Sequence, residues 1–248
     1  MMRVIASYHI KGGVGKTATA VNLAYSSAHE GYSTLLWDLD PQAAASFYFR
    51  IKARVRGGGR RLLTKKHALD EAIKGTDFDN LDLLPADFSY RNLDLMLEES
   101  KHPNQRLKKL LAPLECQYDY IFLDCAPSIS LTSESILHAA DVVLLPTIPT
   151  TLSLRSLDQV FRFCRKEEIS GLHLMPFFSM VDKRKMMHKT VLQTPPKMPE
   201  PFLKSWIPYS SEVEKMGTQR LPVACYAQHG VAAKAYQDLW DEIKVILS

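Results

Sequence analysis

The chain has 248 residues, of which 46% are hydrophobic and 23% are charged, with a formal net charge of +4. This length and balance fit a globular domain with a sizeable buried core and exclude a disordered chain. No apolar run approaches the roughly 18 residues of a membrane-spanning helix, and the first strand-like run has no signal-peptide character, so we expect a cytoplasmic protein.

Strand-like and helical stretches alternate along the chain. A strand is predicted over 3–10, a glycine-rich loop over 11–17 and a helix over 18–30. Further strands are predicted at 34–40, 80–86, 118–126, 141–148 and 172–181, and further helices at 130–140, 153–168 and 232–248. Continuous apolar strands indicate burial on both faces. The fold class is therefore α/β, with a mostly parallel open sheet flanked by helices on both faces.

We find no internal repeat and no second-domain boundary, so one domain is predicted over 1–248. Eight of the 31 Lys and Arg residues fall within 50–66, where no acidic residue occurs, and three glycines accompany them. This composition predicts a flexible basic loop over 50–66, which is either a solvated insertion or a surface that attracts phosphates. A second loop is predicted over 194–201, because its four prolines cannot continue a helix.

The four cysteines show neither CxxC pairs nor regular spacing; they are Cys116, Cys125, Cys164 and Cys225. We therefore expect reduced thiols rather than a disulfide framework or a zinc site.

The glycine-rich loop carries the clearest chemical signal. Gly15, Lys16 and Thr17 match the end of the phosphate-binding pattern G-x-x-x-x-G-K-[ST], whereas Ile10 replaces its first glycine and Lys11 adds a second lysine. Glycines let backbone N–H groups surround phosphate oxygens, Lys16 neutralises their charge, and the Thr17 hydroxyl can bind Mg²⁺. Because the loop lies between a strand and a helix N-terminus, it predicts a nucleotide site.

Three motifs resemble those of the ParA/MinD superfamily of deviant Walker A P-loop ATPases, closest to the ParA (Soj-like) branch. K-G-G-V-G-K-T at 11–17 looks like the deviant Walker A motif, L-L-W-D-L-D-P-Q at 35–42 like Walker A′, and Y-D-Y-I-F-L-D-C-A-P-S at 118–128 like Walker B. The similarity continues through 80–86 and 207–236, so it covers most of the chain.

The resemblance implies an ATPase that uses ATP and Mg²⁺ and forms a homodimer around ATP. Lys11 is then expected to reach the partner subunit's phosphates, and Asp40 to orient the attacking water; with Lys16 these are the predicted catalytic residues. Thr17, Asp38 and Asp124 are the predicted metal site, although Asp38 could instead bind a backbone group or a helix terminus. The predicted nucleotide contacts are Lys11, Gly12, Gly13, Val14, Gly15, Lys16, Thr17 and Ala18, with Met180, Asp182 and Pro208 near adenine.

Three positions in this region depart from the family pattern. His9-Ile10 stands where the family commonly has Asn-Gln, and we interpret His9 as a polar residue at a strand end. Ala18 stands where a second threonine is common, so a hydroxyl contact to the α-phosphate is lost. Since the backbone N–H of Ala18 can still donate, affinity or nucleotide preference is affected more than binding itself.

The resemblance also implies non-specific DNA binding by the ATP dimer, driven by phosphate neutralisation. Arg184 aligns with one DNA-contacting arginine of the family, but Glu212 occupies the second such position. The DNA-binding candidates are Lys183, Arg184 and Lys185, with Arg54, Arg56, Arg60 and Arg61 as a substitute for the lost arginine. The alternative is a solvated basic face.

Other functions remain open at this point. The tail at 232–248 has apolar residues at helical spacing but lacks the basic excess of a membrane-surface helix, so we expect it to pack on the sheet. A ParB-like protein or a cargo adaptor is the expected partner, with nucleoid association if DNA binds. The alternatives are an ATP-switched binding module without DNA binding, a MinD-like membrane ATPase, or a P-loop metabolic enzyme.

Overall fold

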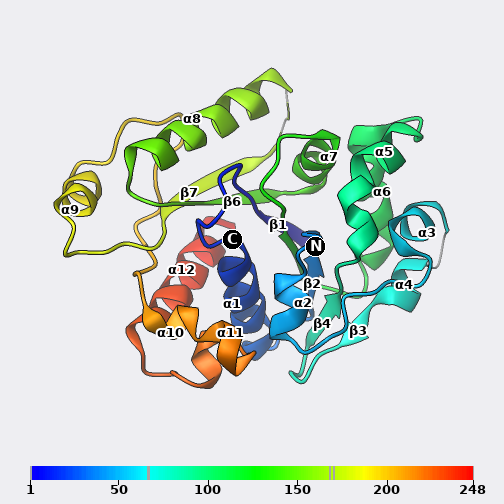
Figure 1. Cartoon of the computed structure of the whole chain (residues 1–248), viewed down its shortest axis with the longest axis horizontal. Helices are drawn as coiled ribbons and strands as arrows, with labels where there is room; N and C mark the ends of the chain where they lie inside the picture. The colour runs from blue at the N-terminus through cyan, green and yellow to red at the C-terminus, as the bar shows by residue number, and fades with distance from the viewer. Residues whose placement is uncertain (1, 66–67, 168, 170, 248) are drawn as a thin grey trace.

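A seven-stranded sheet forms the centre of the molecule, in the order β3-β4-β2-β5-β1-β6-β7 (Figure 1). The structure is a computed structural model that describes residues 2–65, 68–167, 169 and 171–247. The strands are β1 (Arg3–Ser7), β2 (Thr34–Asp38), β3 (Lys74–Gly75), β4 (Leu81–Leu84), β5 (Tyr120–Asp124), β6 (Val142–Thr147) and β7 (His173–Phe178). Strand β3 is antiparallel to β4, and the other neighbours run parallel. The predicted α/β fold is confirmed.

Helices cover both faces of this sheet. α1 and α12 contribute to the core on one face, whereas α7 and α8 contribute to the core on the other (Figure 1). The helices are α1 (Lys16–His29), α2 (Ala44–Tyr48), α3 (Gly58–Thr64), α4 (Ala68–Ala72), α5 (Leu93–Glu98), α6 (Arg106–Leu111), α7 (Leu131–Ala139), α8 (Thr151–Lys166), α9 (Met186–Gln193), α10 (Ser211–Glu214), α11 (Met216–Gln219) and α12 (Val231–Leu247). Short 3₁₀ turns are η1 (Phe88–Asn92), η2 (Pro103–Gln105), η3 (Ala112–Leu114) and η4 (Val223–Cys225).

The central strands are buried as their composition predicts. Every residue of β2 and β6 is buried, which explains why these segments are mostly apolar rather than alternating. The four cysteines are free thiols, two of them exposed and two buried.

The basic segment is more ordered than predicted. Helix α3 occupies 58–64, so the expectation of a loop over 50–66 is wrong for these residues. Val55, Leu62 and Leu63 are buried in the core, and they anchor the segment between the sheet edge and α5. Gly57, which precedes the helix, has the left-handed φ of +78° that favours glycine.

Acidic side chains form ion pairs with two arginines of the basic segment. Arg60 pairs with Glu99 and Arg61 with Glu71, in both cases with 2.6 Å between nitrogen and oxygen. Lys66, the last residue of the predicted loop, lies outside the described residues, as do Glu168 and Ser248 at the ends of two predicted helices. The segment 194–201 follows α9 and contains neither helix nor strand, as predicted.

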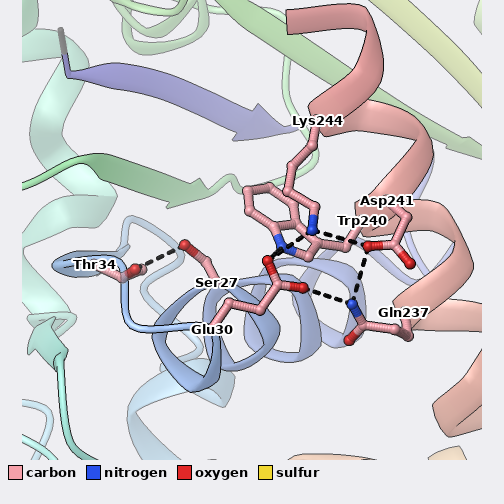
Figure 2. A network of polar contacts seen from close by, with 7 residues as sticks. All are labelled: Ser27, Glu30, Thr34, Gln237, Trp240, Asp241 and Lys244. Atoms are coloured by element: carbon pink, nitrogen blue, oxygen red, sulfur yellow. Dashed lines mark hydrogen bonds and ion pairs between the residues drawn. The ribbon is translucent and has the colours of Figure 1, made fainter. Parts of the chain in front are cut away.

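The C-terminal helix α12 is fixed against α1. Its buried side chains are Ala232, Ala233, Tyr236, Leu239, Trp240 and Ile243. At the end of α1, the Glu30 carboxylate accepts hydrogen bonds from Gln237 Nε2 at 2.7 Å, Trp240 Nε1 at 3.1 Å and Lys244 Nζ at 2.7 Å (Figure 2). The prediction of a tail helix packed on the sheet is therefore confirmed. Within the described part of the chain, no helix is both long and apolar enough to cross a membrane.

Candidate nucleotide-binding site

The loop between β1 and α1 has the backbone of a phosphate-binding turn. Gly13 and Gly15 have φ values of +70° and +96°, which residues with a side chain rarely adopt. A Cβ at Gly15 would lie 2.9 Å from Ser179 Oγ, so both backbone and space require glycine there. Ser7 Oγ on β1 donates to the Lys16 carbonyl at 2.9 Å and ties the start of α1 to the sheet.

Both lysines of the loop lie at this turn. Lys16 is buried, and its Nζ donates to the Lys11 carbonyl oxygen at 3.3 Å. Burial lowers the pKa of Lys16, while the nearby carboxylate of Asp124 acts in the opposite direction. The Lys11 N–H donates to His9 Nδ1 at 3.0 Å. The arrangement places one buried cation beside the loop where phosphates are expected.

Asp124 is a buried carboxylate without a hydrogen-bond donor. It lies at the end of β5, is fully buried, and neither oxygen accepts a hydrogen bond from any residue that the structure describes. Burial raises the pKa of Asp124 well above its ordinary value, and the charges of Asp38 and Asp40 raise it further. The nearby Thr17 hydroxyl and the Lys16 ammonium act in the opposite direction and lower this pKa. An unpaired buried carboxylate is costly, so Asp124 and the Thr17 hydroxyl fit a divalent cation such as Mg²⁺.

Asp38 has a different environment. It pairs in register with Asp124 across β2 and β5, and its Oδ2 accepts from Ser46 N at 2.8 Å and Ser46 Oγ at 2.7 Å. Its Oδ1 accepts from Asp40 N at 3.3 Å. Burial raises the pKa of Asp38 to about 6, although the Ser46 hydrogen bonds oppose this. Both oxygens of Asp38 therefore bind groups of the turn that leads into α2. This favours the alternative role of Asp38, as a partner for a helix terminus, over the role of metal ligand.

A pocket of about 370 Å³ adjoins the phosphate loop. Six of the predicted loop residues line it together with Asp40, and Met180 and Pro208 line its far side. Val14 is fully buried beneath the loop. The lining residues that the sequence did not indicate are Ala44, Tyr48, Pro127, Ser179, Ile207, Tyr209, Ser210, Val213, Glu214 and Tyr236. Several of these follow Pro208 directly, so the similarity over 207–236 was the signal that could have found them.

Asp182 does not line this pocket. Its carboxylate accepts hydrogen bonds from Arg184, with Oδ1 2.9 Å from Nε and Oδ2 3.0 Å from Nη2. These bonds lower the pKa of Asp182 to about 2. The side chain of Asp182 is thus engaged with a candidate DNA-binding arginine, and a contact between Asp182 and adenine stays a prediction.

The basic candidates fall into two separate groups. Lys183, Arg184 and Lys185 lie between β7 and α9, with Lys183 Nζ 4.6 Å from the centre of the Trp206 ring. Arg54, Arg56, Arg60 and Arg61 lie at or before α3, beside the opposite edge of the sheet (Figure 1). Within one chain, the second group therefore does not replace a charge missing from the first.

Glu212 has a structural explanation. Its carboxylate oxygens would lie 2.5 and 2.6 Å from a Cβ at Gly230, the residue before α12. The first turn of α12 contains no acidic residue of its own. A carboxylate at this end of a helix interacts favourably with the helix dipole. Glu212 thus supplies negative charge to the N-terminus of α12.

Comparisons with known proteins give the family. A model of the AAA domain family matches residues 2–170. The chain is 30% identical over 253 residues to the sporulation initiation inhibitor protein Soj of Bacillus subtilis, with 98% of each chain covered. The chain belongs to the ParA/MinD superfamily, on its ParA-like branch. It is also 28% identical to the chromosome partitioning protein ParA of Caulobacter vibrioides, covering 98% of this chain and 94% of the relative.

Solved structures agree with this placement. A plasmid partition protein from Borrelia burgdorferi bound to AMPPNP has a TM-score of 0.80 and 26% identity, with 98% of both chains covered. Cobyrinic acid a,c-diamide synthase from Mycobacterium smegmatis, with a bound ATP analog and magnesium, has a TM-score of 0.81 and 26% identity over 97% of this chain and 93% of the other. The family consists of P-loop ATPases that act in partitioning and positioning, and related structures contain a bound nucleotide and Mg²⁺.

Proposed function

We propose that this protein is an ATPase that dimerises around ATP, binds DNA non-specifically and hydrolyses ATP to segregate or position plasmid, chromosome or protein cargo. The observation that carries the proposal is the pairing of a two-lysine phosphate loop with Asp124, a buried carboxylate that lacks a donor. A buried carboxylate without a donor beside a phosphate loop supports the binding of nucleotide with Mg²⁺.

Some residues of the site bind the nucleotide and Mg²⁺, and others act in hydrolysis. The loop amides and Lys16 hold the phosphates, while Thr17 and Asp124 hold Mg²⁺, which neutralises phosphate charge when bound. Asp40 lines the phosphate end of the pocket, where it orients the attacking water. Lys11 reaches the phosphates of the partner subunit, so that ATP joins the two chains.

DNA binding rests on the group Lys183, Arg184 and Lys185. This group follows Met180, a pocket residue, by only a few positions, so nucleotide binding and the basic surface are close neighbours. Dimerisation doubles the number of such groups. Arg184 has to exchange Asp182 for a DNA phosphate, and an exposed ion pair is weak enough in water for that exchange.

An ATP-switched binding module without DNA binding is the second candidate. The Arg184 ion pair with Asp182, and Glu212 where the family has a basic residue, favour it. In that case a ParB-like protein or a cargo adaptor binds the ATP dimer directly. The protein is expected in the cytoplasm, with nucleoid association under the first candidate alone.

The test is binding to a non-specific DNA duplex with ATP or ADP, at low and high salt. We expect ATP-dependent, salt-sensitive binding in the parent protein, and its loss in Lys11→Ala and Arg184→Ala. Lys108→Ala, which removes an exposed charge on α6, is the matched control and should bind as the parent does. Absence of DNA binding in every nucleotide state, with ATP hydrolysis intact, would reject the DNA-positioning ATPase in favour of the switched module.

A further inference from the structure

His9 is a buried side chain bound to the phosphate loop. It follows β1 and is fully buried, and its Nδ1 accepts the hydrogen bond from Lys11 N–H at 3.0 Å. A side-chain acceptor that binds the N–H two residues later closes the same turn that Asn and Asp make with their side-chain oxygen. The imidazole ring therefore acts here as the acceptor of an Asx-type turn.

The hydrogen bond fixes the protonation of the ring. Since Nδ1 accepts, the neutral ring carries its proton on Nε2. Burial, together with the positive charges of Lys16 and Lys11, lowers the pKa of His9 to about 4. The ring is thus neutral at physiological pH, and its Nδ1 lone pair stays available to the Lys11 N–H.

The Lys11 backbone is held from both sides. Its N–H is bound by His9, and its carbonyl oxygen accepts from Lys16 Nζ at 3.3 Å. A change at His9 therefore affects the positions of both lysine side chains. Lys11 carries one ammonium group, and the Lys11 carbonyl oxygen accepts a hydrogen bond from the other, Lys16 Nζ.

We propose that His9 is a positioning residue for nucleotide binding, which holds the phosphate loop in its binding geometry through Nδ1 as a neutral, Nε2-protonated ring. The inference rests on the proposed function, since it assumes that nucleotide binds at this loop. The residue acts through the Lys11 backbone and touches no phosphate itself. Asn is common at this position in the family. His9 replaces it and still provides a side-chain acceptor for the Lys11 N–H.

If the His9 ring only filled space in the core, its variants would behave differently. The Nε2–H has no acceptor among the residues that the structure describes, so the ring makes one polar contact there. His9→Leu keeps a similar volume and removes the acceptor. His9→Asn reduces the volume and restores an acceptor for the Lys11 N–H. The two variants thus separate packing from the hydrogen bond.

The first measurement is the ring's tautomer in the parent protein by NMR of ¹⁵N-labelled histidine. The His9 signal is identified as the one that His9→Asn removes. We expect a protonated Nε2 and an unprotonated Nδ1 at neutral pH. A charged ring, or a proton on Nδ1, overturns the proposal without reference to any variant's stability.

The second measurement is the affinity for a fluorescent ATP analogue. His9→Leu should bind it about fivefold to tenfold more weakly, the effect of losing one hydrogen bond that preorganises the loop. His9→Asn should stay within about twofold of the parent, as should the exposed control His102→Leu. Equal affinity of His9→Leu and parent, or equal weakness of both His9 variants, overturns the proposal alone. A parent that binds no nucleotide overturns the proposed function and this role together.

Discussion

Replacing Glu30 by Ala should loosen the C-terminal helix. The side chain accepts three hydrogen bonds from α12, and one of the donors, Trp240, is fully buried (Figure 2). A buried N–H without an acceptor costs about 1–3 kcal/mol. Gln237 and Lys244 are partly exposed, and Lys244 keeps Asp241 at 2.9 Å, so their contacts add about 0–1 kcal/mol. The free energy of unfolding should therefore fall by about 1–4 kcal/mol.

Thermal unfolding followed by circular dichroism measures this loss. For a chain of this length, it corresponds to a fall of about 2–16 °C in melting temperature. Glu30→Gln keeps an oxygen that accepts from Trp240 Nε1 and should lose much less stability. Asp241→Asn is a second control, because it changes only the exposed side of the hydrogen-bond network. If Glu30→Ala melts within about 1 °C of the parent, or Asp241→Asn is equally damaging, the buried Trp240 N–H does not carry the energy.

Two further predictions concern the nucleotide site. Because the pKa of Asp124 is raised in the folded chain, its contribution to stability is present below about pH 4, the unfolded value, and is lost as pH rises through the folded value. Without Mg²⁺, Asp124→Asn should therefore gain melting temperature over the parent as pH rises from 5 to about 8, and a pH-independent difference would refute this sign. Gly15→Ala should weaken nucleotide binding more than tenfold, since it combines a φ of +96° with the 2.9 Å approach to Ser179, whereas Gly217→Ala has open space and should bind normally. Equal affinities of the two glycine variants, measured with a fluorescent nucleotide, would contradict that reasoning.

The strands of the site were predictable because their signals are local. The run at 118–126 is mostly apolar and has Asp124 near its end, and the structure places Asp124 at the last position of β5. The phosphate loop likewise follows from glycine, lysine and threonine in fixed order. What the pattern does not contain is the register of β2 against β5, which sets Asp38 beside Asp124 and Ser46 against Asp38.

Other features were missed for physical reasons that differ from case to case. β3 has two exposed residues, too few for any periodic signal. Helix α3 was taken for a loop because glycines and arginines dominate it, although the adjacent Leu62 and Leu63 supply its buried side. The ion pair between Asp182 and Arg184 was also not predicted, although the two residues lie only two positions apart. Such choices between nearby partners depend on side-chain geometry that residue types alone do not specify.

The position of β7 has a practical consequence for anyone who shortens this chain. The segment matched by the family model ends at residue 170, just before β7 begins at His173. A fragment cut there would leave β6 as an edge strand, with unpaired backbone groups along a fully buried run that begins V-V-L-L. Exposed apolar edges pair with other chains, so this fragment should aggregate rather than serve as a minimal ATPase. Expression trials are better directed at the whole chain, with tags placed so that α12 keeps its contact with α1.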